Sequence, residues 1–323
     1  MLAYGDAVFS YTSNGSLQWK VENGDTTWYD YDLLGNLLSV KLPDETLIEY
    51  IIDGQNRRVG KVVNGQFKKG WLYQDQLNPV AELDSTGQIA ARFVYGSKAH
   101  VPDYIIRSDS TYRVITDHLG SVRLIVNTET GSIAQQLLYD EFGNVLLNTA
   151  PDFQPFAFAG GLYDSQTGLV RFGARDYDAG VGRWMAKDPI GFRGEDLNLY
   201  NYVENDPINW IDPLGWIKFK KDISDDDVND VIKNKYDVID AVFKKHKVPE
   251  PTITSTTGDK HKKGSKHYEG KAIDIRGKHI SDTLMKTIAD ELQKELGCDY
   301  DVVPEFFPDK PDWDHIHIEY DPK

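Results

Sequence analysis

Short segments of alternating hydrophobic and polar residues dominate the first two thirds of the chain. The alternation is clear in residues 37–42, 46–52 and 122–126, and it is the period expected of a strand with one buried face. Asn-Gly and Thr-Gly pairs, which favour tight turns, separate these segments. The pattern predicts many short strands joined by turns.

These segments carry a repeat. A Tyr-x-x-x-Gly motif begins at Tyr11, Tyr31 and Tyr50, at intervals of about 20 residues, and occurs again at Tyr139. Such recurrence predicts an antiparallel array in which each hairpin packs against its neighbours. An ordinary β-sandwich with accidental Tyr-Gly spacings is the alternative, and the number of recurrences favours the array.

The pattern changes after Trp216. Apolar residues at helical spacing over 228–243 predict a helix, with Ser224 as its N-cap. Ser281 is positioned to cap a second helix that ends at Gly297. The remaining alternating runs predict strands at 253–257, 300–306 and 315–320.

The sequence therefore divides into an all-β region, residues 1–216, and an α+β domain with an antiparallel sheet, residues 217–323. A length of 323 residues allows two domains. The net charge of −15 argues against nucleic acid as the main partner. The single cysteine, Cys298, excludes an intramolecular disulfide and a cysteine-based zinc site. No apolar run is long enough to span a membrane, and the N-terminus lacks a signal-peptide pattern, so we expect export by another route.

Candidate chemistry is concentrated near the C-terminus. His267 and Asp274 would lie about 10 Å apart on one helix, too far to share a metal. Gly270 allows the chain to turn between them, so that Asp274 falls on a strand between two isoleucines. A buried carboxylate needs a partner, and a metal ion would supply one.

The last predicted strand offers further ligands. His315, His317 and Glu319 share one face of this strand because they alternate with apolar residues. His317 completes a set of three ligands with His267 and Asp274, and three protein ligands are typical of catalytic zinc sites. Asp314 and His315 are both placed to take a proton from a zinc-bound water.

Motifs in the first region resemble Rhs proteins. The resemblance covers roughly residues 25–216, and its motifs are the Tyr-Asp-x-x-Gly-Asn repeats at 31–36 and 139–144, and the segments 117–122, 173–178, 182–184, 188–191, 198–202 and 212–216. It implies a YD-repeat shell and Rhs core that carry a variable C-terminal toxin. It also implies delivery into competing cells by a type VI-like secretion apparatus, and a cognate immunity protein. The repeat and core are too short here to enclose residues 217–323, so the chain is either the tip of a longer protein or a displaced cassette.

The same resemblance implies self-cleavage at the junction, residues 188–216. It assigns an aspartyl pair to Asp188 and Asp212, with Arg175 as a supporting cation and cleavage between Trp216 and Ile217. Two adjacent carboxylates can share a proton and act as an acid–base pair. The two Asp-Pro-x-Gly motifs are separated by about two residues more than is usual in the family, and such motifs outside this context are simple turns.

Residues 250–321 carry a second resemblance. Ser-x-His-x-x-Gly-x-Ala-x-Asp over 265–274, followed by Asp-His-x-His over 314–317, resembles zinc D-alanyl-D-alanine peptidases and the broader hedgehog-like LAS fold. The resemblance implies His267, Asp274 and His317 as Zn²⁺ ligands, Asp314 as the base and His315 as an assisting residue. The family's upstream arginine is missing, and the candidates to replace it are Lys260, His261 and Lys263.

Other polar residues have simpler interpretations. Isolated histidines on strands and helices are usually structural, which we expect of His100, His118, His246 and His279. Glu269 and Glu319 are expected to be solvated or to support a ligand. The Lys260–Lys266 cluster is expected to be a solvated loop.

Together, these features predict an Rhs-type antibacterial toxin whose C-terminal domain is a zinc metallopeptidase of D,D- or L,D-type. Its substrate would be the peptide stems of peptidoglycan in the target-cell periplasm. Two alternatives remain open: a zinc protease that acts on target-cell proteins, and a metal-bound binding module without catalysis.

Overall fold

The structure is a computed structural model of the chain. It describes residues 2–98, 100–188, 198–215, 218–219, 228–246, 248, 252–256, 265–276, 280–309 and 313–322. None of the helices within these ranges is both long and apolar enough to cross a membrane.

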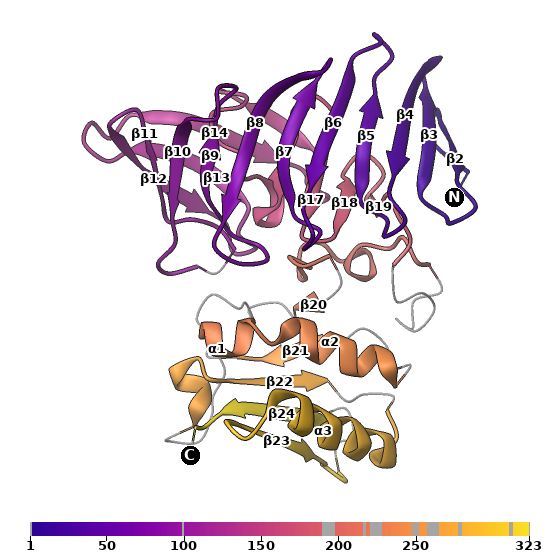
Figure 1. Ribbon diagram of the computed structural model, residues 1–323, viewed down its shortest axis with the longest axis vertical. Coiled ribbons are helices and arrows are strands. Elements are labelled where there is room, and N and C mark those ends of the chain that lie inside the picture. Colours follow the sequence, from indigo (N-terminus) through magenta and orange to yellow (C-terminus); the bar gives the residue numbers. More distant parts are fainter. Residues whose placement is uncertain are drawn as a thin grey trace.

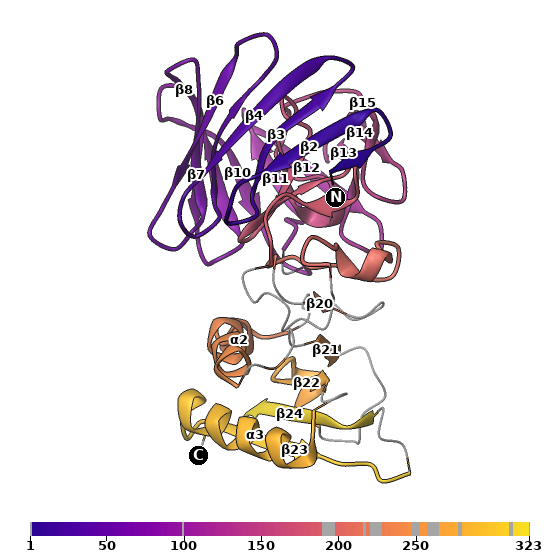
Figure 2. The same cartoon turned by 90° about the vertical axis from the view of Figure 1, so that its right-hand side faces the viewer.

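One antiparallel sheet contains strands β1 to β15, and each of these strands pairs with its neighbours in sequence. The sheet is strongly curved (Figures 1 and 2). This arrangement confirms the predicted hairpin array. Its strands are β1 Ala3–Tyr4, β2 Ala7–Tyr11, β3 Leu17–Glu22, β4 Asp25–Tyr31, β5 Leu37–Lys41, β6 Leu47–Ile52, β7 Arg58–Val63, β8 Gln66–Tyr73, β9 Pro79–Leu83, β10 Ile89–Val94, β11 Tyr104–Arg107, β12 Ser110–Thr116, β13 Val122–Asn127, β14 Ile133–Tyr139 and β15 Val145–Asn148.

The repeated Tyr-Asp-x-x-Gly motif forms the turn between strands. In the β4–β5 turn, Asp32 Oδ1 accepts hydrogen bonds from the backbone N–H groups of Leu34 and Asn36, at 2.8 and 2.9 Å. Gly35 adopts φ +87°, a left-handed conformation that glycine tolerates best. The turn at Asp140 repeats these bonds. The motif therefore fixes each turn through one carboxylate and one glycine.

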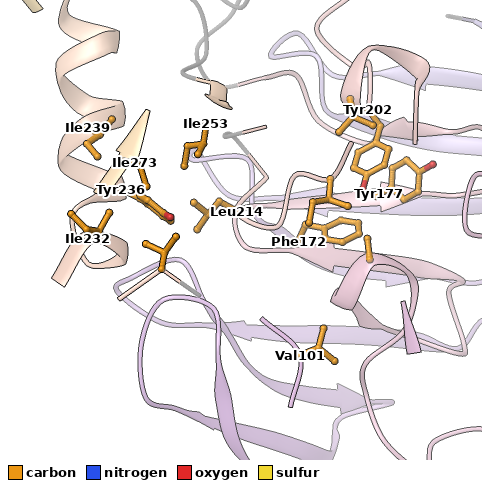
Figure 3. Close-up of a cluster of buried hydrophobic side chains, with 14 of the residues drawn as sticks. Val101, Phe172, Tyr177, Tyr202, Leu214, Ile232, Tyr236, Ile239, Ile253 and Ile273 are labelled. Carbon is orange, nitrogen blue, oxygen red and sulfur yellow. The ribbon is translucent and has the colours of Figure 1, made fainter. Parts of the chain in front are cut away.

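A smaller antiparallel sheet follows the large one. Its strands are β16 Leu162–Tyr163, β17 Leu169–Phe172, β18 Arg175–Asp178 and β19 Arg183–Trp184, and short 3-10 turns lie at Phe158–Gly160 and Val203–Asn205. Phe172, Tyr177, Trp184 and Tyr202 form a buried aromatic cluster here, with the Tyr177 and Tyr202 ring centroids 4.4 Å apart. Figure 3 shows Phe172, Tyr177 and Tyr202 grouped together.

The C-terminal domain combines helices with one sheet. Its sheet has the order β20-β21-β22-β24-β23, and in Figure 2 the helices α2 and α3 cover one side of it. Ile239 and Ile288 are among the buried side chains of these helices. The elements are β20 Lys218–Phe219, α1 Asp230–Lys233, α2 Tyr236–Lys245, β21 Thr252–Ser255, a 3-10 turn Lys266–Glu269, β22 Ala272–Arg276, α3 Asp282–Leu296, β23 Tyr300–Glu305 and β24 His315–Tyr320.

Two details of the predicted domain were wrong. The single helix predicted over 228–243 is divided into α1 and α2, and Asn234 and Lys235 lie between them. The sheet is not wholly antiparallel, since β20 pairs with β21 in parallel. The predicted cap at Ser281 is confirmed, because its hydroxyl accepts the Leu284 N–H. Ser224 lies outside the described residues.

One continuous cluster of buried apolar side chains joins the two regions. It includes Phe172 in the small sheet, Leu214 in the segment after it, and Tyr236 and Ile253 in the C-terminal domain. Figure 3 labels all four. In Figures 1 and 2 the C-terminal domain lies beside the large sheet and is not surrounded by it. The expectation that this shell does not enclose the domain is therefore confirmed.

Candidate metal centre

Three predicted ligands meet at the centre of the C-terminal sheet. Asp274 on β22 lies directly opposite His317 on β24 in the antiparallel register. His267 comes from the preceding 3-10 turn, which Ser265 caps and the left-handed Gly270 ends. Because Gly270 reverses the chain into β22, His267 and Asp274 approach each other as the sequence predicted.

The distances within this set suit a tetrahedral ion. His267 Nε2 lies 3.3 Å from both Asp274 Oδ1 and His317 Nδ1. Bonds of about 2.0–2.1 Å at tetrahedral angles separate neighbouring zinc ligands by about 3.3–3.4 Å. The third separation, from His317 Nδ1 to Asp274 Oδ1, is 2.8 Å, shorter than a tetrahedral edge. Two of the three edges therefore already have the spacing that zinc requires.

Neighbouring groups orient the two imidazoles. His267 is 2% exposed, and its Nδ1–H donates to the Thr256 carbonyl at 3.0 Å. This bond leaves Nε2 facing Asp274 and His317. On His317 the opposite nitrogen, Nε2, lies 3.3 Å from Glu319 Oε2, so Nδ1 faces the set. A partner on the non-ligating nitrogen is the usual support for a metal-binding histidine.

The electrostatics of the set favour a cation. Burial opposes ionisation of Asp274, but contacts with the imidazoles of His267 and His317 outweigh it and hold the pKa of its carboxyl well below the usual value. Burial alone would lower the pKa of His317, but its hydrogen bond to Asp274 raises it. A carboxylate that stays ionised beside two inward-facing imidazoles is a suitable donor set for a divalent metal.

The two candidate bases occupy different positions. His315 Nε2 lies 3.6 Å from Asp274 Oδ1 and 3.3 Å from Glu305 Oε2. Its Nδ1–H donates to the Trp313 carbonyl at 2.8 Å. Asp314 Oδ1 instead accepts the Phe307 backbone N–H at 2.7 Å. Among the described residues, His315 and not Asp314 contacts the ligand set.

Several supporting residues were not found from the sequence. Arg276 faces His315 in the β22–β24 register, two residues from Asp274 and therefore on the same side of the strand. The spacing Asp274-x-Arg276 is the signal that identifies it. Glu305 comes from β23, and only the folded sheet brings it to His315. The sequence candidates Lys260, His261 and Lys263 lie outside the described residues, as does His279.

The structural expectation for His246 agrees with its position. His246 Nε2 lies 2.5 Å from Glu291 Oε2 on α3, away from the ligand set. His118 Nε2 lies 3.1 Å from the Ile208 carbonyl. Glu269 pairs with Lys271 at 2.9 Å. His100 is buried in the first region.

A second group of predicted residues meets at the end of the β region. The side chain of Arg175 is 4% exposed. Its Nη1 lies 3.0 Å from Asp188 Oδ2, and its Nη2 lies 3.2 Å from Asp212 Oδ2. Its Nε–H donates to the Gly215 carbonyl. One guanidinium therefore contacts both aspartates and the carbonyl of Gly215, the residue before Trp216. Trp216 and Ile217 lie outside the described residues.

Open space adjoins this second group. A cavity of about 440 Å³ is lined by Arg175 and Asp188 together with Leu33 and Leu34 from the β4–β5 turn. Leu33 and Leu34 are 94% and 73% exposed. Asp188 therefore borders this cavity.

Comparison with known proteins places the first region. The family model described as Teneurin YD-shell matches residues 1–208. Human teneurin-1 is 30% identical over 229 residues, which cover 68% of this chain and 8% of teneurin-1. The tRNA nuclease WapA of Bacillus subtilis is 29% identical over 221 residues, 66% of this chain and 9% of WapA. The chain thus spans less than a tenth of the length of these relatives.

The chain is also similar to a solved structure. The Tc holotoxin pore of Photorhabdus luminescens is 17% identical, with a TM-score of 0.44 over 65% of this chain and 13% of that chain.

Proposed function

The chain belongs to the teneurin YD-shell family, and on this premise we propose that it is an Rhs-type antibacterial toxin with a zinc-dependent peptidase domain. Residues 217–323 would hydrolyse the peptide stems of peptidoglycan in the periplasm of a target cell. The shell would act as carrier, delivered by a type VI-like apparatus and neutralised in the producer by an immunity protein. The observation that carries the proposal is the spacing of His267, Asp274 and His317.

The ligand set fits zinc. His267 Nε2, Asp274 Oδ1 and His317 Nδ1 would hold the ion, and three ligands leave a fourth position for water or substrate. When bound, zinc lowers the pKa of that water and polarises the scissile carbonyl. Thr256 and Glu319 support the ligating imidazoles from behind.

The remaining residues suggest how the chain would complete the reaction. His315 is the better placed of the two candidate bases, because Glu305 and Trp313 hold its ring beside Asp274. Arg276, on the same face of β22, is the candidate to bind a substrate carboxylate in place of the missing upstream arginine. Asp314 would then stabilise the loop that leads into β24.

Two other functions make different predictions. A zinc protease acting on target-cell proteins would be toxic in the cytoplasm, whereas a wall enzyme is toxic only in the periplasm. Expression of the full chain with and without an export signal separates them, and toxicity confined to the cytoplasm would overturn the wall assignment. A binding module would retain its effect in His315→Ala and Asp314→Ala variants that still hold zinc.

The relatives named as tRNA nucleases suggest a third alternative. The family model ends at residue 208, so the family assignment concerns the shell. The net charge of −15 is unfavourable for binding RNA. The histidine and carboxylate set in the C-terminal domain therefore remains the better guide to activity. Incubation with total tRNA is the direct check.

We also propose that the chain cleaves itself between Trp216 and Ile217. The supporting observation is that Arg175 contacts Asp188, Asp212 and the Gly215 carbonyl together. One guanidinium would hold both carboxylates near the Gly215 carbonyl, and its charge would favour the ionised form that a base requires. The two aspartates would then act as acid and base on the nearby peptide bond.

A further inference from the structure

A small cavity lies between the large sheet and the small sheet. Its volume is about 30 Å³, which is room for one small ion or a water molecule. Arg57 and Arg58 line it from the large sheet, and Arg171 lines it from β17. Among the described residues that line it, none is an aspartate or glutamate. Three guanidinium groups therefore line the cavity.

The nearby carboxylates do not balance these charges. Arg57 has its own partner, Asp53, at 2.8 Å. Arg58 and Arg171 share the single carboxylate of Asp176, at 2.8 and 2.9 Å. Both of these arginines are 3% exposed. One positive charge is therefore left over in the interior, where an uncompensated charge is costly.

Other charged groups close to the pair do not remove the excess. Lys61 and Asp164 form a buried pair of their own at 2.7 Å, which is neutral overall. The Tyr50 ring lies 3.5 Å from the Arg58 guanidinium carbon and carries no charge. Burial, with the nearby charge of Arg58, lowers the pKa of Arg171 despite its contact with Asp176. Burial also opposes the charge of Arg58, but Asp176, Tyr50 and Asp164 outweigh it, so the pKa of Arg58 is raised.

Two buried donors also lack an acceptor. The Nε atoms of Arg58 and Arg171 have no hydrogen-bond partner within the part of the chain that the structure describes. The other end of Arg171 is occupied, since Nη2 donates to Asn36 Oδ1 at 2.9 Å. Both N–H groups are buried, and buried donors require an acceptor.

We propose that this cavity binds a small monovalent anion, with chloride as the natural candidate. The ion would accept hydrogen bonds from the two Nε–H groups and neutralise the excess charge. A water molecule would accept hydrogen bonds from the donors but would leave the excess positive charge uncompensated. The volume is too small for a larger organic anion.

The position of the cavity gives the anion a structural role. Arg58 belongs to β7 of the shell, whereas Arg171 belongs to β17 of the small sheet. Gly173 and Pro213 also line the cavity, and they lie two residues from Arg175 and next to Asp212 in the chain. The ion would therefore fasten the shell to the segment that carries the proposed cleavage residues.

Crystals of the full chain grown in sodium bromide provide the direct test. An anomalous difference peak in the cavity, within hydrogen-bond distance of Arg58 Nε and Arg171 Nε, is expected. A cavity that contains only a water molecule, or bromide at other positions alone, would overturn the proposal. This measurement needs no variant, so it stands even if substitutions unfold the chain.

Thermal unfolding gives a second test in solution. The midpoint temperature of unfolding of the full chain should be higher in sodium chloride or bromide than in sodium gluconate at equal ionic strength, because gluconate is too large to enter the cavity. Arg171→Gln should abolish the difference between salts because it removes the excess charge. Arg123→Gln, which alters an ion pair with Asp117 outside the cavity, should keep the difference. Equal midpoints for the unaltered chain in the two salts would contradict the proposal.

Discussion

His317 Nδ1 lies 2.8 Å from Asp274 Oδ1, and the two residues face each other across neighbouring strands. This pair defines the site, because a strand pair fixes both backbones and leaves the side chains little freedom. His267 approaches from a 3-10 turn and completes a set whose atoms all lie within 4.8 Å of one another. The predictions below test the set, its neighbours and the turns that support the shell.

Zinc binding should depend on the three ligands. His267→Ala should remove stoichiometric zinc from the purified chain, as measured by elemental analysis. Glu319→Gln, which only weakens the support for His317, should lower zinc affinity about 10–100-fold. His246→Ala is the matched control, because His246 pairs with Glu291 outside the set and should keep zinc. Zinc retained by the His267 variant would remove this residue from the site.

Catalysis should depend more on His315 than on Asp314. His315→Gln should lower peptide hydrolysis about 10²–10⁴-fold with zinc retained, the range expected for losing a general base. Asp314→Asn should have a smaller effect, because its amide oxygen can still accept the Phe307 N–H. The measurement is turnover of a muropeptide by zinc-loaded variants. The opposite order of effects would identify Asp314 as the base.

Self-cleavage should require both aspartates. Intact mass measurement of the unaltered chain should show two products that separate after Trp216. Asp188→Asn and Asp212→Asn should leave the chain whole, since an amide cannot share the proton. The exposed loop variant Asp109→Asn should cleave normally. An unaltered chain that stays whole would contradict self-cleavage.

Two glycines test the shell turns. Gly35 and Gly143 occupy the same turn position, with φ +87° and +91°. Gly35→Ala should cost about 1–2 kcal/mol of unfolding free energy, from left-handed strain alone. Gly143→Ala should cost about 1–3 kcal/mol more, because an added Cβ would lie 2.4 Å from the Phe158 ring. Urea unfolding of the two variants gives the comparison, and equal losses would show that Phe158 moves aside.

Local signals in the sequence predicted much of the fold. The alternation in residues 122–126 and 315–320 is a property of single strands, and it gave bounds close to those of β13 and β24. Ser281 and Gly297 limit a helix through contacts made within a few residues. Helix spacing alone did not predict the break at Lys235, because the apolar face continues across it from Ile232 to Tyr236.

Long-range contacts were harder to predict. His267, Asp274 and His317 were identified because their spacing and the turn at Gly270 limit where they can lie. Glu305 was not, because its contact with His315 depends on β23 pairing with β24. The contact between Arg58 and Asp176 joins residues 118 positions apart, and no local pattern indicates such a contact.

Digestion of purified peptidoglycan by the full chain tests the central claim most directly. With zinc, chromatography and mass spectrometry should show released stem-peptide fragments. EDTA should stop the release, added zinc should restore it, and Asp274→Asn should be inactive throughout. A zinc-loaded chain that leaves the muropeptide profile unchanged would contradict the assignment of residues 217–323 as a peptidoglycan peptidase.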